Sequence, residues 1–142
     1  MFVKDENGGT LSEFALTAPI LFLVLFGIIE FGVLLHDRAI IINASREGAR
    51  AGIVFDHPNR ISDADIQQVV TNYCGTYLIS LGSGATTPTT AITRTGNTHG
   101  DRLTVTVNYT YRFLVFSNLL ALVGGTSNDL INLTGETVMR ME

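Results

Sequence analysis

One apolar segment, residues 14–35, constrains this chain more than any other feature of its sequence. Fifteen of its 22 residues are Leu, Ile, Val or Phe. As a helix with a rise of ~1.5 Å per residue it would be about 33 Å long, close to the ~30 Å hydrocarbon core of a bilayer. The summed free energy of membrane insertion of these side chains is roughly −4 to −9 kcal/mol. One carboxylate within the helix costs ~3 kcal/mol, which does not cancel this sum. The segment therefore predicts a membrane-spanning helix.

A cleaved secretory signal is the main alternative for this segment. Such a signal has a basic start, an apolar region of ~7–15 residues and a small-residue cleavage site. The chain instead begins MFVKDENGG, and the helical pattern continues beyond residue 35 through HDRAIIINASREGARAGIVF. The sequence therefore favours one long helix over residues 9–55, with small residues around REGARAG that suggest a closely packed face.

The remaining residues, 56–142, predict a small soluble α+β domain. Ser62 and Asp65 have the spacing of a capping box, and apolar residues then recur at helical spacing. AITRT and LTVTVNYTYRF predict a β-hairpin around GNTHGD, and DLINLTGETVMRM predicts a last strand. The expected fold class is α+β, with the membrane-spanning helix packed on a small antiparallel sheet beside one additional amphipathic helix.

Two features of this domain have competing interpretations. Cys74 falls on the apolar face of the predicted second helix, where a free cysteine behaves as a small hydrophobe. The run LVFSNLLALVGG, residues 114–125, is either a short helix under the sheet or an exposed loop that binds a partner. The packed alternative is favoured for this run.

Composition and motif content exclude several function classes. The net charge is −4 and no Lys/Arg-rich run occurs, so no nucleic-acid partner is expected. His36, His57 and His99 are scattered without metal-ligand spacing. No phosphate-binding loop, nucleophile elbow or Cys–His pair appears. We therefore expect a protein without enzymatic activity and without a cofactor.

The run GGTLSEFALTAPILFLVLFGIIEFGVLLHDRAIIINASREGARAG resembles the N-terminal region of TadE-like pseudopilins. These are minor pilin-like proteins of the bacterial tight-adherence (Tad) pilus, in the type IVb pilin class. That family carries a glycine, four further residues, and then a glutamate followed by an aromatic residue. Here these are Gly8 and the pair Glu13-Phe14, and the final TVMRME is similar to the family's C-terminus.

The resemblance implies a pilin-like fold and a structural or assembly role in a Tad-type pilus. A prepilin peptidase would remove residues 1–8 as a leader by cutting between Gly8 and Gly9. The further partners would be other pilin or pseudopilin subunits, the inner-membrane assembly platform and membrane lipid. The protein would cross the inner membrane once with its C-terminal domain in the periplasm, and entry into the extracellular filament is left open. The alternative function is a single-pass, membrane-anchored periplasmic binding or sensor module.

Three arginines oppose this topology. Arg38, Arg46 and Arg50 follow the span and only Lys4 precedes it, so the positive-inside rule alone would place the C-terminal side in the cytoplasm.

Two glutamates in the apolar run also have two interpretations each. Glu13 is either a solvated residue favoured by the helix macrodipole or, as the resemblance implies, an assembly residue that pairs with the α-amine of a neighbouring subunit's Gly9. Phe14 belongs to the same assembly motif. Glu30 either extends to the lipid headgroups or pairs with a polar group on a partner helix.

Overall fold

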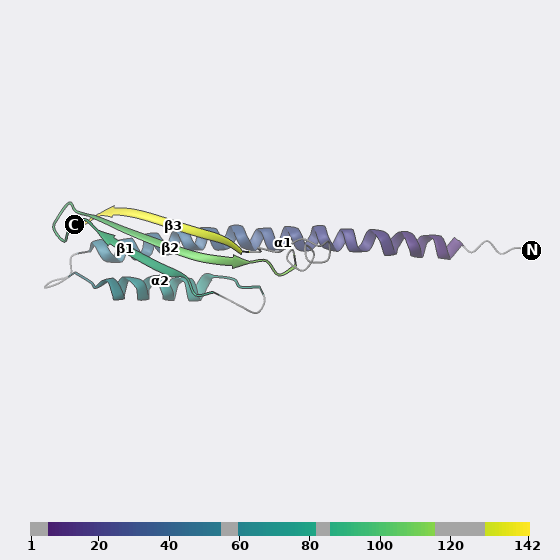
Figure 1. Cartoon of the computed structure of the whole chain (residues 1–142), viewed down its shortest axis with the longest axis horizontal. Helices are drawn as coiled ribbons and strands as arrows, with labels where there is room; N and C mark the ends of the chain where they lie inside the picture. Colours follow the sequence, from purple (N-terminus) through teal and green to yellow (C-terminus); the bar gives the residue numbers. More distant parts are fainter. Residues whose placement is uncertain (1–5, 55–59, 82–85, 116–129) are drawn as a thin grey trace, which may run out of the picture.

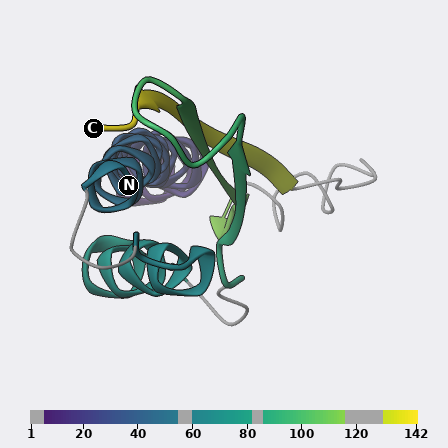
Figure 2. The same cartoon turned by 90° about the vertical axis from the view of Figure 1, so that its left-hand side faces the viewer.

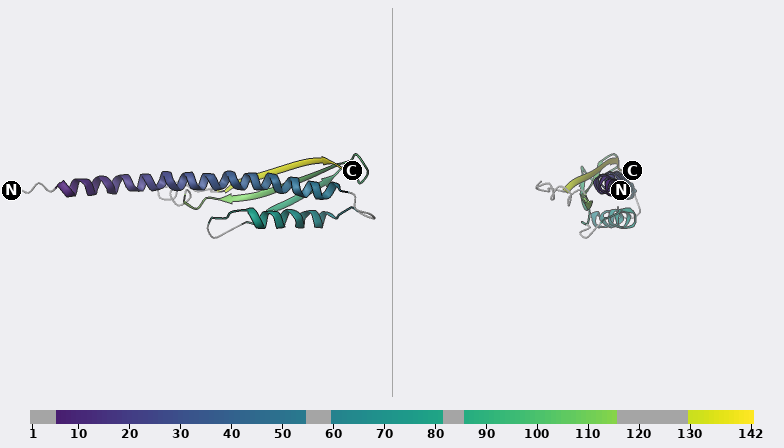
Figure 3. Two further views of the ribbon diagram at one scale, coloured as in Figure 1. Left: turned by 180° about the vertical axis from the view of Figure 1, so that it is seen from behind. Right: turned by 90° about the vertical axis from the view of Figure 1, so that its right-hand side faces the viewer.

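The computed structural model describes residues 6–54, 60–81, 86–115 and 130–142. The elements are, in chain order, α1 (Glu6–Ile53), α2 (Asp63–Tyr77), β1 (Thr89–Arg94), β2 (Arg102–Arg112) and β3 (Leu130–Arg140). The 48-residue helix α1 runs along the whole molecule, and the other elements gather around its C-terminal half (Figure 1). Its N-terminal half projects away from them (Figure 3). The predicted α+β, pilin-like class is confirmed.

The sheet has three antiparallel strands in the order β1-β2-β3. The predicted hairpin is the β1–β2 pair, in which Ile92 lies opposite Val105, and β3 pairs with the other edge of β2. The sheet covers both helices, because β2 and β3 contact α1 while β1 contacts α2. Figure 2 shows α1 between β3 and α2 when the molecule is viewed from one end.

The core lies between the sheet and the two helices. Alternate residues of β2 are buried, as the sequence pattern predicts for a strand with one face on a core. They pack with residues of both helices that are themselves buried, in a cluster that includes Leu103, Val105, Val107, Tyr109 and Tyr111 of β2, Ile66, Val70 and Cys74 of α2, and Ile41 and Ala44 of α1. The predicted place of Cys74 on an apolar face is thus confirmed.

The capping box at the start of α2 is also present. The Asp65 backbone N–H donates to Ser62 Oγ at 3.2 Å, and the Ser62 N–H donates to Asp65 Oδ2 at 3.1 Å. These bonds satisfy backbone donors that the first turn of a helix leaves without a partner. The local sequence therefore determines where α2 begins.

Small residues allow the elements to approach α1 closely. A Cβ atom added at Gly52 would lie 2.4 Å from a Leu103 methyl group, and one added at Gly135 of β3 would lie 2.7 Å from the Ile41 carbonyl oxygen. The packed face predicted around REGARAG is present, and Gly135 supplies its counterpart on the sheet.

Helix α1 has two parts with different surroundings. From Leu11 to Ile29 every large apolar side chain is at least 39% exposed. From Glu30 onward one side of the helix is buried under the domain. The uncovered part, residues 9–29, is about 31 Å long at the usual helical rise.

The ends of α1 differ from the expected range of 9–55. The helix begins at Glu6, within the residues expected to form the leader, and ends at Ile53. Because no helix-breaking residue separates ENGG from the apolar run, the local sequence lets the helix extend upstream. Residues 116–125, the larger part of LVFSNLLALVGG, lie outside the described residues, so both interpretations of that run stay untested.

Candidate membrane and assembly site

The two glycines of the expected cleavage site lie in the first turns of α1. Gly9 is exposed, and a Cβ atom added to it would meet nothing within 4 Å. The Ser12 hydroxyl donates to the Gly9 carbonyl at 2.9 Å. The structure therefore shows Gly8 and Gly9 as helical backbone, with open space around Gly9.

Glu13 and Phe14 follow about one turn later. Glu13 is exposed and the Phe14 side chain is 67% exposed. Glu13 is four residues after Gly9, which places both on the same side of the helix about 6 Å apart along its axis. The side chains of the glutamate-aromatic pair are thus accessible to a neighbouring molecule.

The helix that carries these residues can cross a membrane by its length and composition. Its stretch Gly9–Ile53 contains a window of mean hydropathy 2.5, of which only 11% is buried within the protein. A core helix of a soluble protein with the same hydropathy would be mostly buried. The low burial therefore favours a membrane role for α1.

Glu30 has partners within its own chain. Its side chain is 3% exposed, and its Oε1 accepts hydrogen bonds from the backbone N–H groups of Leu114 and, at 3.3 Å, Val115. The Tyr111 hydroxyl donates to the Glu30 carbonyl at 3.2 Å. Neither sequence interpretation of Glu30 included this contact, which joins α1 to the residues directly after β2.

The N-terminal sequence also matches a known family. A family model for TadE-like proteins matches residues 8–50. Over these residues the chain is TadE-like. The match begins at Gly8 and includes Glu13, Phe14 and Glu30. No curated protein and no solved structure matches the chain. TadE-like proteins are Tad pilus-associated and of a structural, non-enzymatic kind.

Two further side chains of α1 attach the TadE-like protein's second helix, and sequence reasoning missed both. The Ile79 N–H donates to Asp37 Oδ1 at 3.0 Å, and His36 Nε2 lies 3.3 Å from the Tyr77 carbonyl. Asp37 is fully buried, and its Oδ2 has no hydrogen-bond partner among the described residues. Burial raises the pKa of Asp37, while the Ile79 hydrogen bond and the nearby His36 oppose this shift. The spacing of seven residues between Glu30 and Asp37 was the available signal, because it puts both on one side of the helix.

Burial also fixes the protonation state of Tyr111. The pKa of the Tyr111 hydroxyl is raised to about 12. Burial is the largest cause, and the nearby Glu30, Asp37 and Tyr109 raise it further. The hydroxyl therefore keeps its proton at neutral pH and remains a donor to the Glu30 carbonyl.

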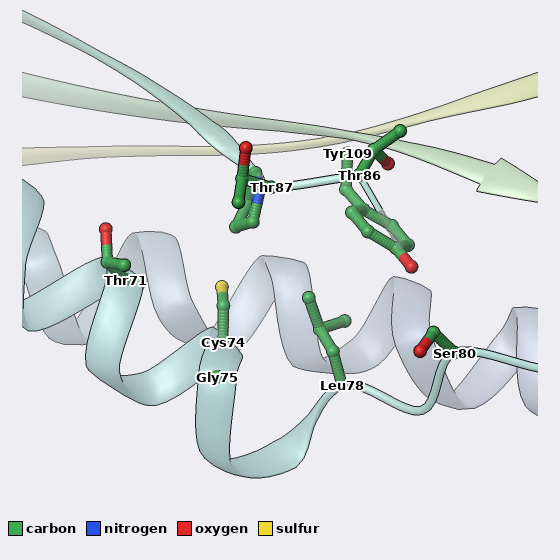
Figure 4. Close-up of a pocket in the computed structure, with 9 residues that line it drawn as sticks. Thr71, Cys74, Gly75, Leu78, Ser80, Thr86, Thr87 and Tyr109 are labelled. Carbon is green, nitrogen blue, oxygen red and sulfur yellow. The ribbon is translucent and has the colours of Figure 1, made fainter. Parts of the chain in front are cut away.

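The domain packed on α1 contains a pocket of about 240 Å³ between the end of α2 and the sheet (Figure 4). Its lining combines apolar groups with the hydroxyls of Thr71, Ser80, Thr86, Thr87 and Tyr109. Burial raises the pKa of the Cys74 thiol to about 11, so the thiol is protonated at neutral pH and is a poor nucleophile. In the described part of the chain, no three His, Cys, Asp or Glu side chains are grouped to hold a metal ion. The pocket can receive a small molecule, and its described lining residues include no acid–base pair for catalysis.

Proposed function

We propose that this TadE-like protein is a pseudopilin or minor pilin, a structural or assembly subunit of a Tad-type type IVb pilus. The observation that carries the proposal is the uncovered apolar part of α1, residues 9–29, with the exposed Glu13-Phe14 pair near its start. Such a helix can be anchored in the inner membrane and later packed against the helices of other pilin subunits. Its partners are those subunits, the prepilin peptidase and the inner-membrane assembly platform.

The burial of side chains along α1 supports a proposal for where the membrane boundary lies. The domain covers Glu30 and Leu34, which are 3% and 7% exposed, so these side chains do not face the bulk of the lipid. The uncovered residues 9–29 span about 31 Å, enough for a hydrocarbon core of ~30 Å. We therefore place the hydrocarbon boundary close to Ile29 and not at residue 35.

The proposal includes removal of residues 1–8 by a prepilin peptidase. Glycine at positions 8 and 9 supports this, because a backbone without a side chain allows close approach of the peptidase. Co-expression with an active prepilin peptidase should shorten the chain to begin at Gly9, as measured by the mass of the membrane-extracted protein. Gly8→Leu should prevent cleavage, whereas the matched control Gly32→Leu should be cleaved normally. An unchanged mass of the unmodified chain would refute processing.

Glu13 is proposed to pair with the Gly9 ammonium of a neighbouring subunit. Leaving one member of a buried ion pair without its partner costs ~3–5 kcal/mol, and about 1.4 kcal/mol corresponds to a factor of ten in association. Glu13→Ala and Glu13→Gln should therefore reduce crosslinking to pilin subunits by roughly a hundredfold or more, while insertion and cleavage continue. The exposed Glu47→Gln serves as a control. If both Glu13 variants crosslinked as well as the wild-type protein, Glu13 would be only a solvated residue favoured by the helix macrodipole.

The C-terminal domain is proposed to be periplasmic, against the positive-inside rule. Arg46 lies about 25 Å beyond Ile29 along the helix, and Arg50 forms an ion pair with Glu47 at 3.5 Å. Charges on a helix that is docked to a folded domain are a weak guide to orientation, since the rule applies to short loops close to the span. A reporter that is active only in the periplasm, fused after Glu142, should be active. Activity of a cytoplasm-only reporter at the same position would reverse the assignment.

A membrane-anchored binding or sensor module is the second candidate. The 240 Å³ pocket between α2 and the sheet is the observation that favours it. Leader removal separates the two functions, because a pilin-like subunit is processed by the prepilin peptidase and an ordinary membrane anchor is not.

A further inference from the structure

A second pocket lies where the uncovered part of α1 meets the domain. It has a volume of about 210 Å³ and is lined by Gly27, Glu30, Phe31 and Phe113. The Glu30 carboxylate already accepts hydrogen bonds from backbone N–H groups after β2. Among the described residues the remaining lining is two aromatic rings and the bare backbone of a glycine, so the pocket suits an apolar guest.

The level of this pocket along α1 limits what can occupy it. Gly27 and Phe31 lie on either side of Ile29, where we place the hydrocarbon boundary. A pocket at that level opens toward acyl chains and not toward bulk water. Apolar cavities of ~150 Å³ in proteins stay dry and bind small hydrocarbons, so this larger pocket has room for a segment of one chain.

An arginine lies above the pocket on the same side of α1. Arg38 follows Gly27 by eleven residues, which is three helical turns plus ~20° and a rise of about 16 Å. Arg38 is exposed. A guanidinium at this height can donate two hydrogen bonds to a lipid phosphate while the acyl chain reaches down to the pocket.

We propose that this pocket binds one acyl chain of a membrane phospholipid whose phosphate pairs with Arg38. A helix from a second copy is the less suitable occupant, because helix pairs need a long stripe of contact and the described lining of this pocket is four residues. The proposal rests on the membrane placement of α1 given above and adds a specific lipid contact to it.

The test uses the full-length protein in phosphatidylglycerol–phosphatidylcholine vesicles that contain a phospholipid with a photoactivatable diazirine on its acyl chain. After irradiation, mass spectrometry of proteolytic fragments locates the adducts. Wild-type protein should be labelled at Phe113, a residue outside α1, as well as along the span. Gly27→Leu should reduce the Phe113 adduct about tenfold, equivalent to ~1.4 kcal/mol of binding.

The chain offers a matched control for this substitution. A Cβ atom at Gly27 or at Gly32 meets nothing within 4 Å, so neither leucine forces the backbone to move, but only Gly27 lines the pocket. Gly32→Leu should therefore keep the Phe113 adduct. Arg38→Gln should reduce labelling by the phospholipid probe but not by a diazirine diacylglycerol, which lacks the phosphate.

Each other outcome has a defined meaning. Labelling along residues 14–26 without an adduct at Phe113, or an adduct of equal yield in Gly27→Leu, would overturn the lipid pocket and leave the membrane anchor intact. Crosslinks between two copies through Gly27 and Phe113 would assign the pocket to a second subunit. Absence of label from residues 14–26 in the wild-type protein would refute the membrane placement itself.

Discussion

Replacing Glu30 by alanine should destabilise the soluble domain even though it makes the membrane helix more apolar. The side chain is 3% exposed, and its carboxylate is the acceptor for the N–H groups of Leu114 and Val115. A buried donor that loses its acceptor costs ~1–3 kcal/mol. Because the Leu114 side chain is 44% exposed, water can replace part of the lost bonding. The free energy of unfolding should therefore fall by about 1–2 kcal/mol, near the lower end of that range.

Thermal unfolding in detergent micelles measures this change. Far-ultraviolet circular dichroism is the suitable signal, since the chain has no tryptophan. For a domain of ~60–100 residues, each kcal/mol lowers Tm by about 4–8 °C. Glu30→Gln keeps an acceptor oxygen and should lose less than half as much as Glu30→Ala.

The matched control is Glu47→Ala in the same helix. The Glu47 side chain is 43% exposed and forms an ion pair with Arg50 at 3.5 Å, a pair worth at most ~0.5 kcal/mol. Equal Tm values for Glu30→Ala and Glu47→Ala would show that the contact with Leu114 and Val115 adds no stability. That result would return Glu30 to the two membrane interpretations, headgroup contact or a partner helix.

Two further predictions concern packing and pH. Gly135→Ala should lower the free energy of unfolding by about 1–3 kcal/mol, because the new Cβ meets the Ile41 carbonyl and not a flexible side chain. The control Gly75→Ala, whose new Cβ meets nothing within 4 Å, should raise the free energy of unfolding by ~0.5–1 kcal/mol, because alanine favours a helix more than glycine does. The pKa of Asp37 is raised in the folded state above its ordinary value of 3.8, so the folded protein binds this proton more tightly than the unfolded chain does. The contribution of Asp37 to stability therefore falls as pH rises from 3.8 through the pKa that Asp37 has in the folded protein. Asp37→Asn should remove that dependence, so its Tm should increase relative to wild type between pH 4 and pH 7, and parallel pH profiles would contradict the assignment.

The parts of the fold that could be predicted from the sequence are those encoded over short distances. The capping box needs only Ser62 and Asp65, and the buried face of β2 follows from alternation between Leu103 and Tyr111. The length and composition of the apolar run are enough to predict a span. The glutamate-aromatic pair after Gly8 was likewise visible as a motif.

The face of α1 that docks on the domain could not be predicted in the same way. Around Glu30 nearly every neighbour is apolar, so the hydrophobic pattern has no helical period that separates lipid-facing from domain-facing residues. The partner of Glu30 is the backbone of Leu114, 84 positions away, and backbone N–H groups carry no sequence signal. The same reason hid the contact between Asp37 and Ile79.

The distribution of polar groups along the uncovered helix explains why the two glutamates should differ in function. Within residues 9–29, Glu13 is the single charged side chain. The hydroxyls of Ser12 and Thr17 each donate to a carbonyl of their own helix at 2.9 Å, so they need no external partner. Beyond Ile29, Glu30 and Asp37 accept hydrogen bonds from backbone N–H groups of the domain. With the leader removed as proposed, Lys4 would be absent and the new ammonium of Gly9 on a neighbouring helix would be a cation near the level of Glu13. If these helices pack together in an apolar environment, the Glu13–Gly9 pair would supply the charge pairing between subunits, whereas Glu30 has hydrogen-bond partners in its own chain.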